Sequence, residues 1–264
     1  MTGHLPGPPE QSAPKRLKGK VALVTGASKR IGRALAIALA EEGVNIIAHD
    51  RRAQESETSR VCGEVQDCGA KSWKVLADLD KPEDYETLLA LALQTAGSLD
   101  ILINNASIFS PGRLMDVGYG DVMRHMHVNA WAPFVLSREF ARLVRSGKII
   151  NLLDTKIAGY DREHVAYILS KQMLSILTRM CALEFAPGVT VNAVAPGLIL
   201  PPTGKDDAYL EQLAQGVPLK RHGSPADIAE AAIYLLKSDY VTGQIIYVDG
   251  GRRLLEVGNG PDPD

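Results

Sequence analysis

Two side chains that could share a proton stand four residues apart in the second half of the chain. Tyr167 and Lys171 occupy positions i and i+4 of the segment Tyr-Ile-Leu-Ser-Lys, so they lie on one face of any helix that forms there. An ammonium group stabilises a nearby phenolate, and we therefore expect Lys171 to lower the pKa of Tyr167 from its reference value of about 10. Such a phenol is a usable proton donor at neutral pH. Asp154 ends an apolar run 13 residues before Tyr167 and is a candidate for the same chemistry.

A candidate anion site follows the first apolar run of the chain. The segment Thr-Gly-Ala-Ser-Lys-Arg-Ile-Gly at 25–32 comes directly after that run and is followed by a helical pattern. The free N–H groups and the dipole of a helix N-terminus bind anions, so this turn predicts a phosphate site. A turn of small residues without a ligand is the alternative. The candidate cofactor-binding residues here are Gly26, Ser28, Lys29, Arg30 and Ile31.

The end of the second apolar run bears on the choice of dinucleotide. Asp50 stands about 20 residues beyond the glycines, where an acid commonly accepts a hydrogen bond from a ribose hydroxyl, and this favours NAD. Arg51 and Arg52, together with Lys29 and Arg30, favour the 2′-phosphate of NADP. We therefore predict NADPH and keep NADH open. The alternative for both arginines is a solvated helix start.

The end of the third apolar run is placed to face an adenine. Asp78 and Leu79 stand there, and both are candidate cofactor contacts. The alternative for Asp78 is a cap of the helix that begins near Pro82.

Short apolar runs alternate with helix-length amphipathic stretches from residue 20 onward. Several runs are apolar at every position, as expected of strands that are covered on both faces. The alternation predicts an α/β fold: one Rossmann-like, doubly wound domain with a seven-stranded parallel sheet flanked by helices. The expected strands are Val21–Thr25, Val44–His49, Ser72–Ala77, Ile101–Asn104, Lys148–Leu153, Val189–Val194 and Ile245–Val248. The clearest helices are the one that contains Ile31–Leu39, then Pro82–Ala96, Ala166–Leu183 and Pro225–Leu236, the last with Ser224 as its N-cap.

The ends of the chain differ in composition from this central part. We expect an N-terminal tail over residues 1–18, an NAD(P)-binding domain over 19–255 and a flexible C-terminal tail over 256–264. The first tail is rich in Pro and Gly and is interpreted as a disordered extension, with a docking or targeting role as the alternative. Residues 196–224 are expected to form an irregular loop over the carboxyl ends of the strands.

Composition excludes several classes of protein. The 264 residues are 45% hydrophobic and 23% charged, so collagen-like and wholly disordered chains are excluded. A net charge of -2 argues against binding of nucleic acid or an anionic membrane, and no run reaches the roughly 20 apolar residues of a membrane span. The 3 cysteines and 6 histidines form no CxxC or HExxH motif, so we expect no disulfide framework and no metal site, in a cytoplasmic protein.

These motifs together resemble those of the short-chain dehydrogenase/reductase family across essentially all of residues 20–255. The resemblance implies hydride transfer with NAD(P)H, with Tyr167 as proton donor, Lys171 binding the nicotinamide ribose and Asn129 holding a water of the proton relay. It also implies a small-molecule substrate and a homodimer or homotetramer. The matching residues are Thr25, Gly26 and Gly32, Asp78, Asn104-Asn105-Ala106, Asn129, Tyr167 and Lys171, Pro196-Gly197 and Val248–Gly251. The further cofactor contacts that it implies are Asn105, Ala106, Ser107, Pro196, Gly197 and Ile199.

Three departures from the usual family pattern look like those of pteridine reductases and bacterial dihydromonapterin reductases. Arg30 replaces the middle glycine, Ser107 stands where a glycine usually ends the loop, and Asp154 replaces the catalytic serine. Phe109 matches the aromatic residue that such enzymes stack on the pterin. A ketone needs a neutral donor beside the tyrosine, whereas a pterin offers N–H donors and a C=N bond that a carboxylate can serve. The substrate-binding set implied is Arg30, Ser107, Phe109, Asp154 and Tyr167.

Plainer alternatives exist for each of these residues. Asp154 could pair with Lys156, Arg30 could be a surface charge, and Phe109 could cover the core. The first interpretation is NADPH-dependent reduction of a pterin of the dihydromonapterin, dihydrobiopterin or dihydrofolate type. The second is reduction of a carbonyl such as a ketone, an aldehyde or a 3-oxoacyl thioester. The third, a non-catalytic dinucleotide sensor, is disfavoured by the presence of a proton donor at Tyr167.

The sequence itself gives only weak support for an oligomer. The long helix expected over residues 166–183 carries an apolar face that favours contact with a second copy, and packing against the sheet is the alternative. The residues of that face are Met173, Leu174, Leu177 and Met180.

Overall fold

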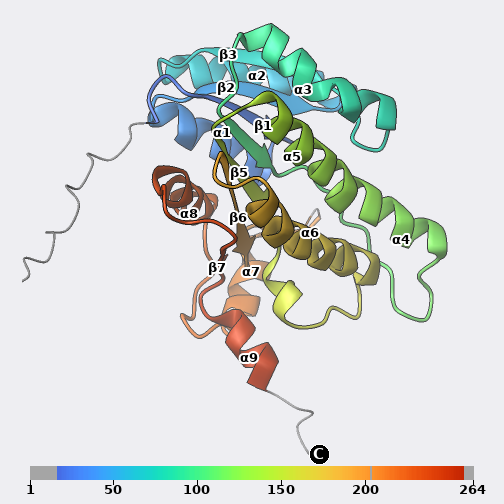
Figure 1. Cartoon of the computed structure of the whole chain (residues 1–264). Helices are drawn as coiled ribbons and strands as arrows, with labels where there is room; N and C mark the ends of the chain where they lie inside the picture. Colours follow the sequence, from blue (N-terminus) through green and yellow to red (C-terminus); the bar gives the residue numbers. More distant parts are fainter. Residues whose placement is uncertain (1–16, 203, 259–264) are drawn as a thin grey trace, which may run out of the picture.

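The seven expected strands form one parallel sheet. The computed structural model describes residues 17–202 and 204–258, and within them the strand order is β3-β2-β1-β4-β5-β6-β7 (Figure 1). The predicted α/β architecture is thereby confirmed. The order reverses between β1 and β4, and ligands of such sheets bind where the carboxyl ends diverge. The strands are β1 (Val21–Thr25), β2 (Asn45–Asp50), β3 (Ser72–Leu76), β4 (Ile101–Asn104), β5 (Gly147–Leu152), β6 (Val189–Pro196) and β7 (Ile245–Val248).

Helices cover both faces of this sheet. The helix over 225–237 begins with the predicted cap: Ser224 Oγ accepts from the N–H of Asp227, whose carboxylate accepts in return, so two free N–H groups are satisfied. A π-helical turn, His127–Trp131, joins two of the helices. The helices are α1 (Arg30–Glu41), α2 (Glu55–Asp67), α3 (Pro82–Ala96), α4 (Tyr119–Met126), α5 (Ala132–Leu143), α6 (Val165–Glu184), α7 (Asp207–Ala214), α8 (Pro225–Lys237) and α9 (Arg252–Gly258).

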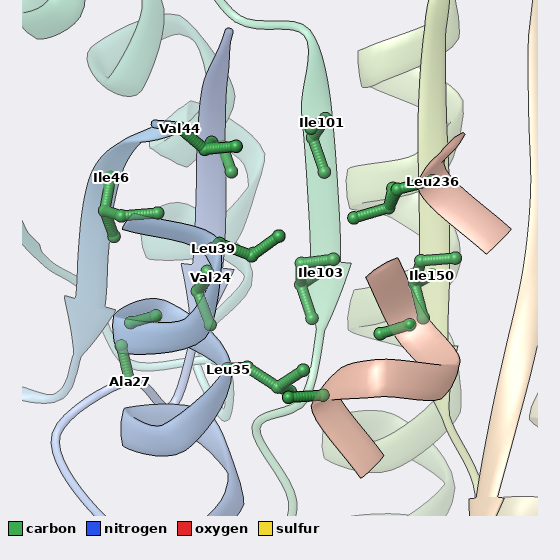
Figure 2. Packing of buried hydrophobic residues seen from close by; sticks show 14 of the residues in the cluster. Val24, Ala27, Leu35, Leu39, Val44, Ile46, Ile101, Ile103, Ile150 and Leu236 are labelled. Atoms are coloured by element: carbon green, nitrogen blue, oxygen red, sulfur yellow. The ribbon is translucent and has the colours of Figure 1, made fainter. Parts of the chain in front are cut away.

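Two hydrophobic cores sandwich the sheet. One packs α1, α2 and α8 against residues of β1, β2, β4 and β5 such as Val24, Ile46 and Ile103 (Figure 2). The other packs α3 and α5 against the opposite face, where Leu23 and Leu102 point. The central strands β1 and β4 are buried along their whole length, and this burial on both sides is why their residues are apolar at successive positions. The rigid sheet fixes the ends of β1, β4 and β5, from which the candidate site is built.

Three details differ from the sequence-based expectations. The stretch 196–224 is not irregular throughout, because Asp206 caps α7 by accepting from the N–H of Tyr209. Leu17, expected in the N-terminal tail, is buried in the first core, and residues 1–16 lie outside the described part. The helix α9 continues to Gly258, three residues beyond the expected domain end, while 259–264 are not described. Across residues 17–202 and 204–258, no helix combines the length and the apolar character that crossing a bilayer needs.

Candidate active site

A carboxylate and a phenol meet at the carboxyl end of β5. Asp154 follows that strand by two residues and caps a short 3-10 turn, accepting the N–H of Lys156 at 2.8 Å. Its other oxygen accepts from the hydroxyl of Tyr167, on the first turn of α6, at 3.0 Å. The side chain of Lys156 pairs instead with Asp161. Asp154 therefore hydrogen-bonds Tyr167, and the alternative, an ion pair between Asp154 and Lys156, does not form.

The expected lowering of the tyrosine pKa is wrong for this arrangement. Burial, and then the nearby carboxylate of Asp154, raise the pKa of Tyr167 well above its ordinary value. The ammonium of Lys171 lies 5.7 Å from the phenol ring centroid, whereas the carboxylate is hydrogen-bonded to the hydroxyl, so the closer negative charge dominates. Tyr167 therefore holds its proton firmly and has it to donate.

The acid and the lysine beside the phenol are both shifted towards their neutral forms. Burial raises the pKa of Asp154, although hydrogen bonds from Lys156 and Tyr167 oppose the shift. Burial lowers the pKa of Lys171 to about 8, with Asp154 opposing. Its ammonium donates to the carbonyl of Leu152 at 2.7 Å. Three buried titratable groups with shifted pKa values in one cluster are typical of a site that moves protons.

Asn129 hydrogen-bonds both the loop after β4 and helix α6. It lies in the π-helical turn, and its side-chain oxygen accepts the N–H of Ile108 at 2.8 Å. Its amide donates to the carbonyl of Ile108 at 2.9 Å and to the hydroxyl of Ser170 at 3.0 Å. Both amide hydrogens are thus committed to protein acceptors. The side chain ties the loop after β4 to α6, and its expected hold on a relay water stays a prediction.

The glycine turn after β1 has no room for side chains. Gly26 adopts φ 65°, and a Cβ there would lie 2.9 Å from Ala106 Cα. A Cβ on Gly32 would lie 2.1 Å from the carbonyl oxygen of Gly26, so both positions require glycine. Asn105 buttresses the turn, because its amide donates to the carbonyls of Thr25 and Gly26. The backbone of α1 can therefore approach an anion closely.

Asp50 is held by this turn. Its carboxylate accepts from the hydroxyl of Ser28 at 2.5 Å and, through the other oxygen, from the N–H of Arg51 at 2.8 Å. The oxygen bonded to the Ser28 hydroxyl also accepts the N–H of Ser28 at 3.4 Å. Both oxygens already have protein donors, so the acid is expected to bind a ribose hydroxyl less well than its position in the sequence suggests. The four candidate cations Lys29, Arg30, Arg51 and Arg52 are all exposed.

Arg30 connects the turn to the loop that follows β6. It has φ 52°, an unusual conformation for a residue with a side chain. Its guanidinium donates to the carbonyl of Pro201 at 2.9 Å. The same loop holds Pro196 and Gly197, where a Cβ on Gly197 would lie 2.6 Å from Asp249 Cα, and the buried Ile199.

The remaining predicted cofactor contacts are placed at the ends of β1, β3 and β4. Asp78 does not cap α3, which has Lys81 at its N-cap position; its carboxylate accepts from the N–H of Asp80. Leu79 is buried and Ser107 is exposed. Ile31 packs at the edge of the first core.

Phe109 lies beside the phenol. Its ring stands perpendicular to that of Tyr167, with 4.7 Å between centroids, and stacks on His164 at 4.1 Å. About half of its surface, 51%, stays exposed, so it does not serve as buried core. The next residue is anchored, because Ser110 N–H donates to His125, which in turn bonds the carbonyl of Asp121. The loop is therefore fixed to α4 on one side.

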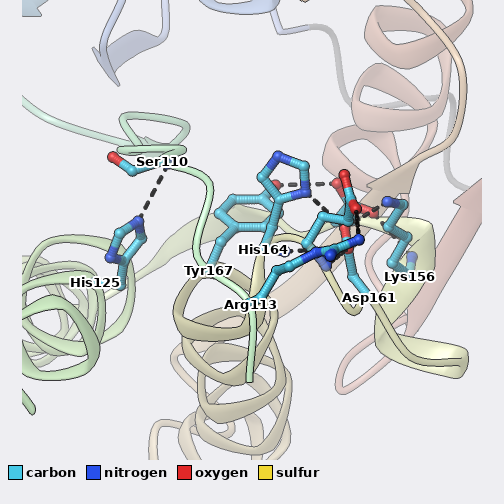
Figure 3. Close-up of polar contacts among 9 residues, drawn as sticks. Ser110, Arg113, His125, Lys156, Asp161, His164 and Tyr167 are labelled. Carbon is cyan, nitrogen blue, oxygen red and sulfur yellow. Dashed lines mark hydrogen bonds and ion pairs between the residues drawn. The ribbon is translucent and has the colours of Figure 1, made fainter. Parts of the chain in front are cut away.

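Sequence reasoning gave no site role to three residues that border this site, although Lys156 was considered as a partner of Asp154. Asp161 and His164 hydrogen-bond each other at 3.0 Å, and Lys156 pairs with the same carboxylate. Figure 3 shows these side chains gathered next to Tyr167. The one sequence signal was the density of titratable residues just before Tyr167, which by itself indicates a solvated turn.

A family model and a curated relative both match this chain over most of its length. A family model described as enoyl-(acyl carrier protein) reductase matches residues 26–253. The 3-oxoacyl-(acyl-carrier-protein) reductase FabG of Staphylococcus epidermidis is 34% identical over 240 residues, which cover 88% of this chain and 98% of the relative.

Structure comparisons add two kinds of neighbour. FolM alternative dihydrofolate reductase 1 of Brucella canis, complexed with NADP, superposes with a TM-score of 0.83 at 29% identity, covering 91% of this chain and 96% of the neighbour. The promiscuous reductase LugOII, which catalyses keto-reduction at C1 during lugdunomycin biosynthesis, has a TM-score of 0.84 at 33% identity, with coverage of 90% and 99%. One of these neighbours is named for dihydrofolate and the other for a ketone.

Proposed function

Because this chain belongs to the short-chain dehydrogenase/reductase family, it is an NAD(P)H-dependent oxidoreductase, and we propose that it reduces a pterin with NADPH. One observation carries the choice of substrate: the residue that hydrogen-bonds the hydroxyl of Tyr167 is the partly buried carboxylate of Asp154, at 3.0 Å. A carbonyl oxygen and a carboxylate are both acceptors and would repel each other across this site. A dihydropterin brings N–H donors and a C=N bond, which suit the same carboxylate.

Each active-site residue has a defined task in this reaction. When bound, the dinucleotide would supply the hydride that the carbon of the substrate C=N bond accepts. Tyr167 holds a proton for the nitrogen of that bond, and Asp154 orients the phenol and shares in the protonation of the ring. Lys171, fixed by the carbonyl of Leu152, binds the ribose next to the nicotinamide. Phe109 covers one side of the flat substrate.

The residues around the glycine turn fit NADPH. Gly26 and Gly32 form a cradle that any side chain would fill, and the N–H groups of α1 receive the pyrophosphate. The carboxylate of Asp50 already accepts from Ser28 and from a backbone N–H, while Arg51 and Arg52 are exposed beside it. Two guanidinium groups next to an engaged acid favour a 2′-phosphate over a free hydroxyl. The solved complex of FolM from Brucella canis with NADP supports the same choice.

A direct assay separates the two substrate classes. Oxidation of NADPH is followed by absorbance with 7,8-dihydrobiopterin, dihydromonapterin and dihydrofolate, and in parallel with a panel of ketones, aldehydes and a 3-oxoacyl thioester. We expect turnover of at least one dihydropterin with the higher kcat/KM. Efficient turnover of carbonyls with none of pterins would contradict the proposal, because the carboxylate would then be tolerated beside a carbonyl.

Reduction of a carbonyl is the second candidate. The similarity to FabG at 34% identity and to LugOII at 33% favours it. The exposed Arg30 and Phe109 would then line a wide entrance for a larger substrate. The third possibility, a dinucleotide sensor, leaves the buried proton-holding cluster without a use.

We also propose that the protein is a homodimer or homotetramer in the cytoplasm. The outer side of α6 carries an exposed apolar stripe, with Leu169, Ile176, Met180 and Leu183 spaced by three, four or seven residues. Such a stripe on a helix marks a contact with a second copy. The expected face is shifted, because Leu174 is buried in the protein's own core. The free thiols at Cys62, Cys68 and Cys181 suit a reducing compartment.

A further inference from the structure

The loop after β4 is joined to the start of α6 at His164. Gly112 and His164 form an isolated parallel β-bridge. Gly112 N–H donates to the carbonyl of Glu163 at 2.7 Å, and Val165 N–H donates to the carbonyl of Gly112 at 3.1 Å. The segment that carries Phe109 is therefore pinned next to the imidazole of His164.

The imidazole covers one face of Phe109. The two rings are nearly parallel, at 15° with 4.1 Å between centroids, while the ring of Tyr167 stands at 88° to Phe109. Phe109 thus sits in a corner formed by the two other rings. The imidazole covers one face of the ring, yet 51% of the residue stays exposed. Part of the ring beside Tyr167 is therefore accessible to a flat ligand.

His164 is itself held by a buried charge. Its Nδ1 donates to the carboxylate of Asp161 at 3.0 Å, and the side chain of Asp161 is only 4% exposed. The ammonium of Lys156 pairs with the same carboxylate (Figure 3). The second carboxylate oxygen accepts the backbone N–H groups of Glu163 and His164, at 2.8 and 3.1 Å. The carboxylate therefore fixes both the backbone and the ring of His164.

Asp161 is ionised as this arrangement requires. Burial alone would raise the pKa of Asp161, but the hydrogen bond and charge of Lys156 and the backbone donors bring it below its ordinary value. A charged acceptor makes stronger and more directional hydrogen bonds than a neutral one. The orientation of the imidazole is consequently fixed at neutral pH.

We propose that His164 is a positioning residue of the substrate site, which sets the plane of Phe109 so that the accessible part of that ring packs against a flat heterocyclic substrate beside Tyr167. The contacts run from Lys156 through Asp161 and His164 to Phe109. The inference rests on the proposed function in its choice of a pterin as the flat substrate. It assigns His164 no proton to move, because it acts through Phe109.

Two substitutions separate the stacked ring from the rest of the residue. His164→Ala removes the ring, and His164→Phe keeps a flat ring without Nδ1. With 7,8-dihydrobiopterin we expect His164→Ala to raise KM about 3- to 10-fold, the range of one aromatic pair, and to leave kcat and the Kd for NADPH within about twofold. His164→Phe is expected to restore KM in part, because it keeps the stacked ring but loses the hydrogen bond to Asp161. In a Phe109→Leu background His164→Ala is expected to add nothing, because the two residues act as one unit.

The matched control is Glu163→Gln, one residue away. Glu163 forms an exposed ion pair with Arg113 at 2.8 Å, and such pairs contribute little, so KM is expected to stay unchanged. An unchanged KM in His164→Ala overturns the inference. So does a His164→Phe protein as impaired as His164→Ala, or a parallel loss of NADPH affinity.

The same series distinguishes this inference from the proposed function. Turnover of dihydrobiopterin by the wild type tests the function, and the KM ratio of the variants tests His164. If the wild type reduces the flat quinone menadione but no pterin, the proposed function fails and the KM comparison is made with menadione under the same criteria. Turnover of acyclic ketones alone would overturn both, since these substrates have no plane to stack.

Discussion

The hydroxyl of Tyr167, which is buried, donates to the partly buried carboxylate of Asp154 at 3.0 Å. Lys171 alone was expected to lower the pKa of Tyr167, but in this pair the pKa of Tyr167 is raised. Burial and the carboxylate raise the pKa of the phenol, and burial raises that of the carboxyl group. The phenol therefore keeps its proton, in a hydrogen bond to Asp154, at the place where the substrate must be protonated.

Replacement of Tyr167 by phenylalanine removes the proton donor and leaves the ring. We expect kcat to fall by about 10²- to 10⁴-fold, the usual contribution of a general acid. The Kd for NADPH, measured by fluorescence titration, is expected to change little. A variant with unimpaired turnover would show that the proton comes from elsewhere.

Replacement of Asp154 by asparagine is expected to lower activity and raise stability at neutral pH. Because folding raises the pKa of Asp154, the acid favours the folded state at low pH and loses that contribution as the pH rises through the folded pKa. Asparagine carries no charge, so its Tm should exceed that of the wild type by about 2–4 °C at pH 8. The advantage should vanish below about pH 4, where both side chains are neutral.

Calorimetric scans at the two pH values test this expectation. If the variant had the same Tm advantage over the wild type at both pH values, the added stability would come from packing and not from the charge of Asp154. Asp154→Ser gives a second readout: it is expected to damage pterin reduction more than NADPH affinity. Equal damage to both would contradict a carboxylate that faces the substrate.

Much of the fold was predictable because its central strands are buried on both faces. The expected runs Val21–Thr25, Ile101–Asn104 and Ile245–Val248 coincide with β1, β4 and β7. A strand that lies between two layers of helices consists of consecutive apolar residues, which the sequence shows directly. The helix α7 was missed, because Leu210 and Ala214 are its only buried residues and Pro201, Pro202 and Gly204 precede it. Its cap at Asp206 was the available signal.

The candidate site was predictable only in part. Spacing along one helix brings Tyr167 and Lys171 together, and a motif identifies Asp154. The stack of Phe109 on His164 joins residues 55 positions apart, and no local pattern encodes such a pairing. The engagement of Asp50 by Ser28 is similarly a contact in space. The raised pKa of Tyr167 likewise depends on its burial and on its contact with Asp154, which the spacing of residues along the sequence does not reveal.

The titration of Lys171 should appear in the pH profile. Burial lowers its pKa to about 8, so a growing fraction of the free enzyme loses the ammonium above that pH. We expect kcat/KM for NADPH to fall as the pH rises through about 8. In Lys171→Arg, whose guanidinium does not titrate in this range, the fall should disappear; a fall that persists belongs to another group.

The apolar stripe of α6 can be tested by charge. Glutamate at Ile176 or Met180 is expected to lower the mass measured by sedimentation, because a charge in the middle of an apolar contact is costly to bury. Tyr240→Glu is the control, since Tyr240 is fully exposed and outside the stripe. Variants that keep the wild-type mass would contradict an interface on this face of α6.

Cofactor choice can be tested at the end of β2. Replacing Arg51 and Arg52 by alanine removes two donors to a 2′-phosphate, and each charge-assisted hydrogen bond is worth about 1.5–3 kcal/mol. The loss of both bonds corresponds to a factor of about 100 or more, so we expect KM for NADPH to rise by at least about 100-fold while KM for NADH changes little. Arg60→Ala is the matched control, because Arg60 is an exposed arginine of α2 paired with Glu64. Equal weakening of both dinucleotides by the double variant would mean that the two arginines only begin a solvated helix and that specificity is set by Asp50.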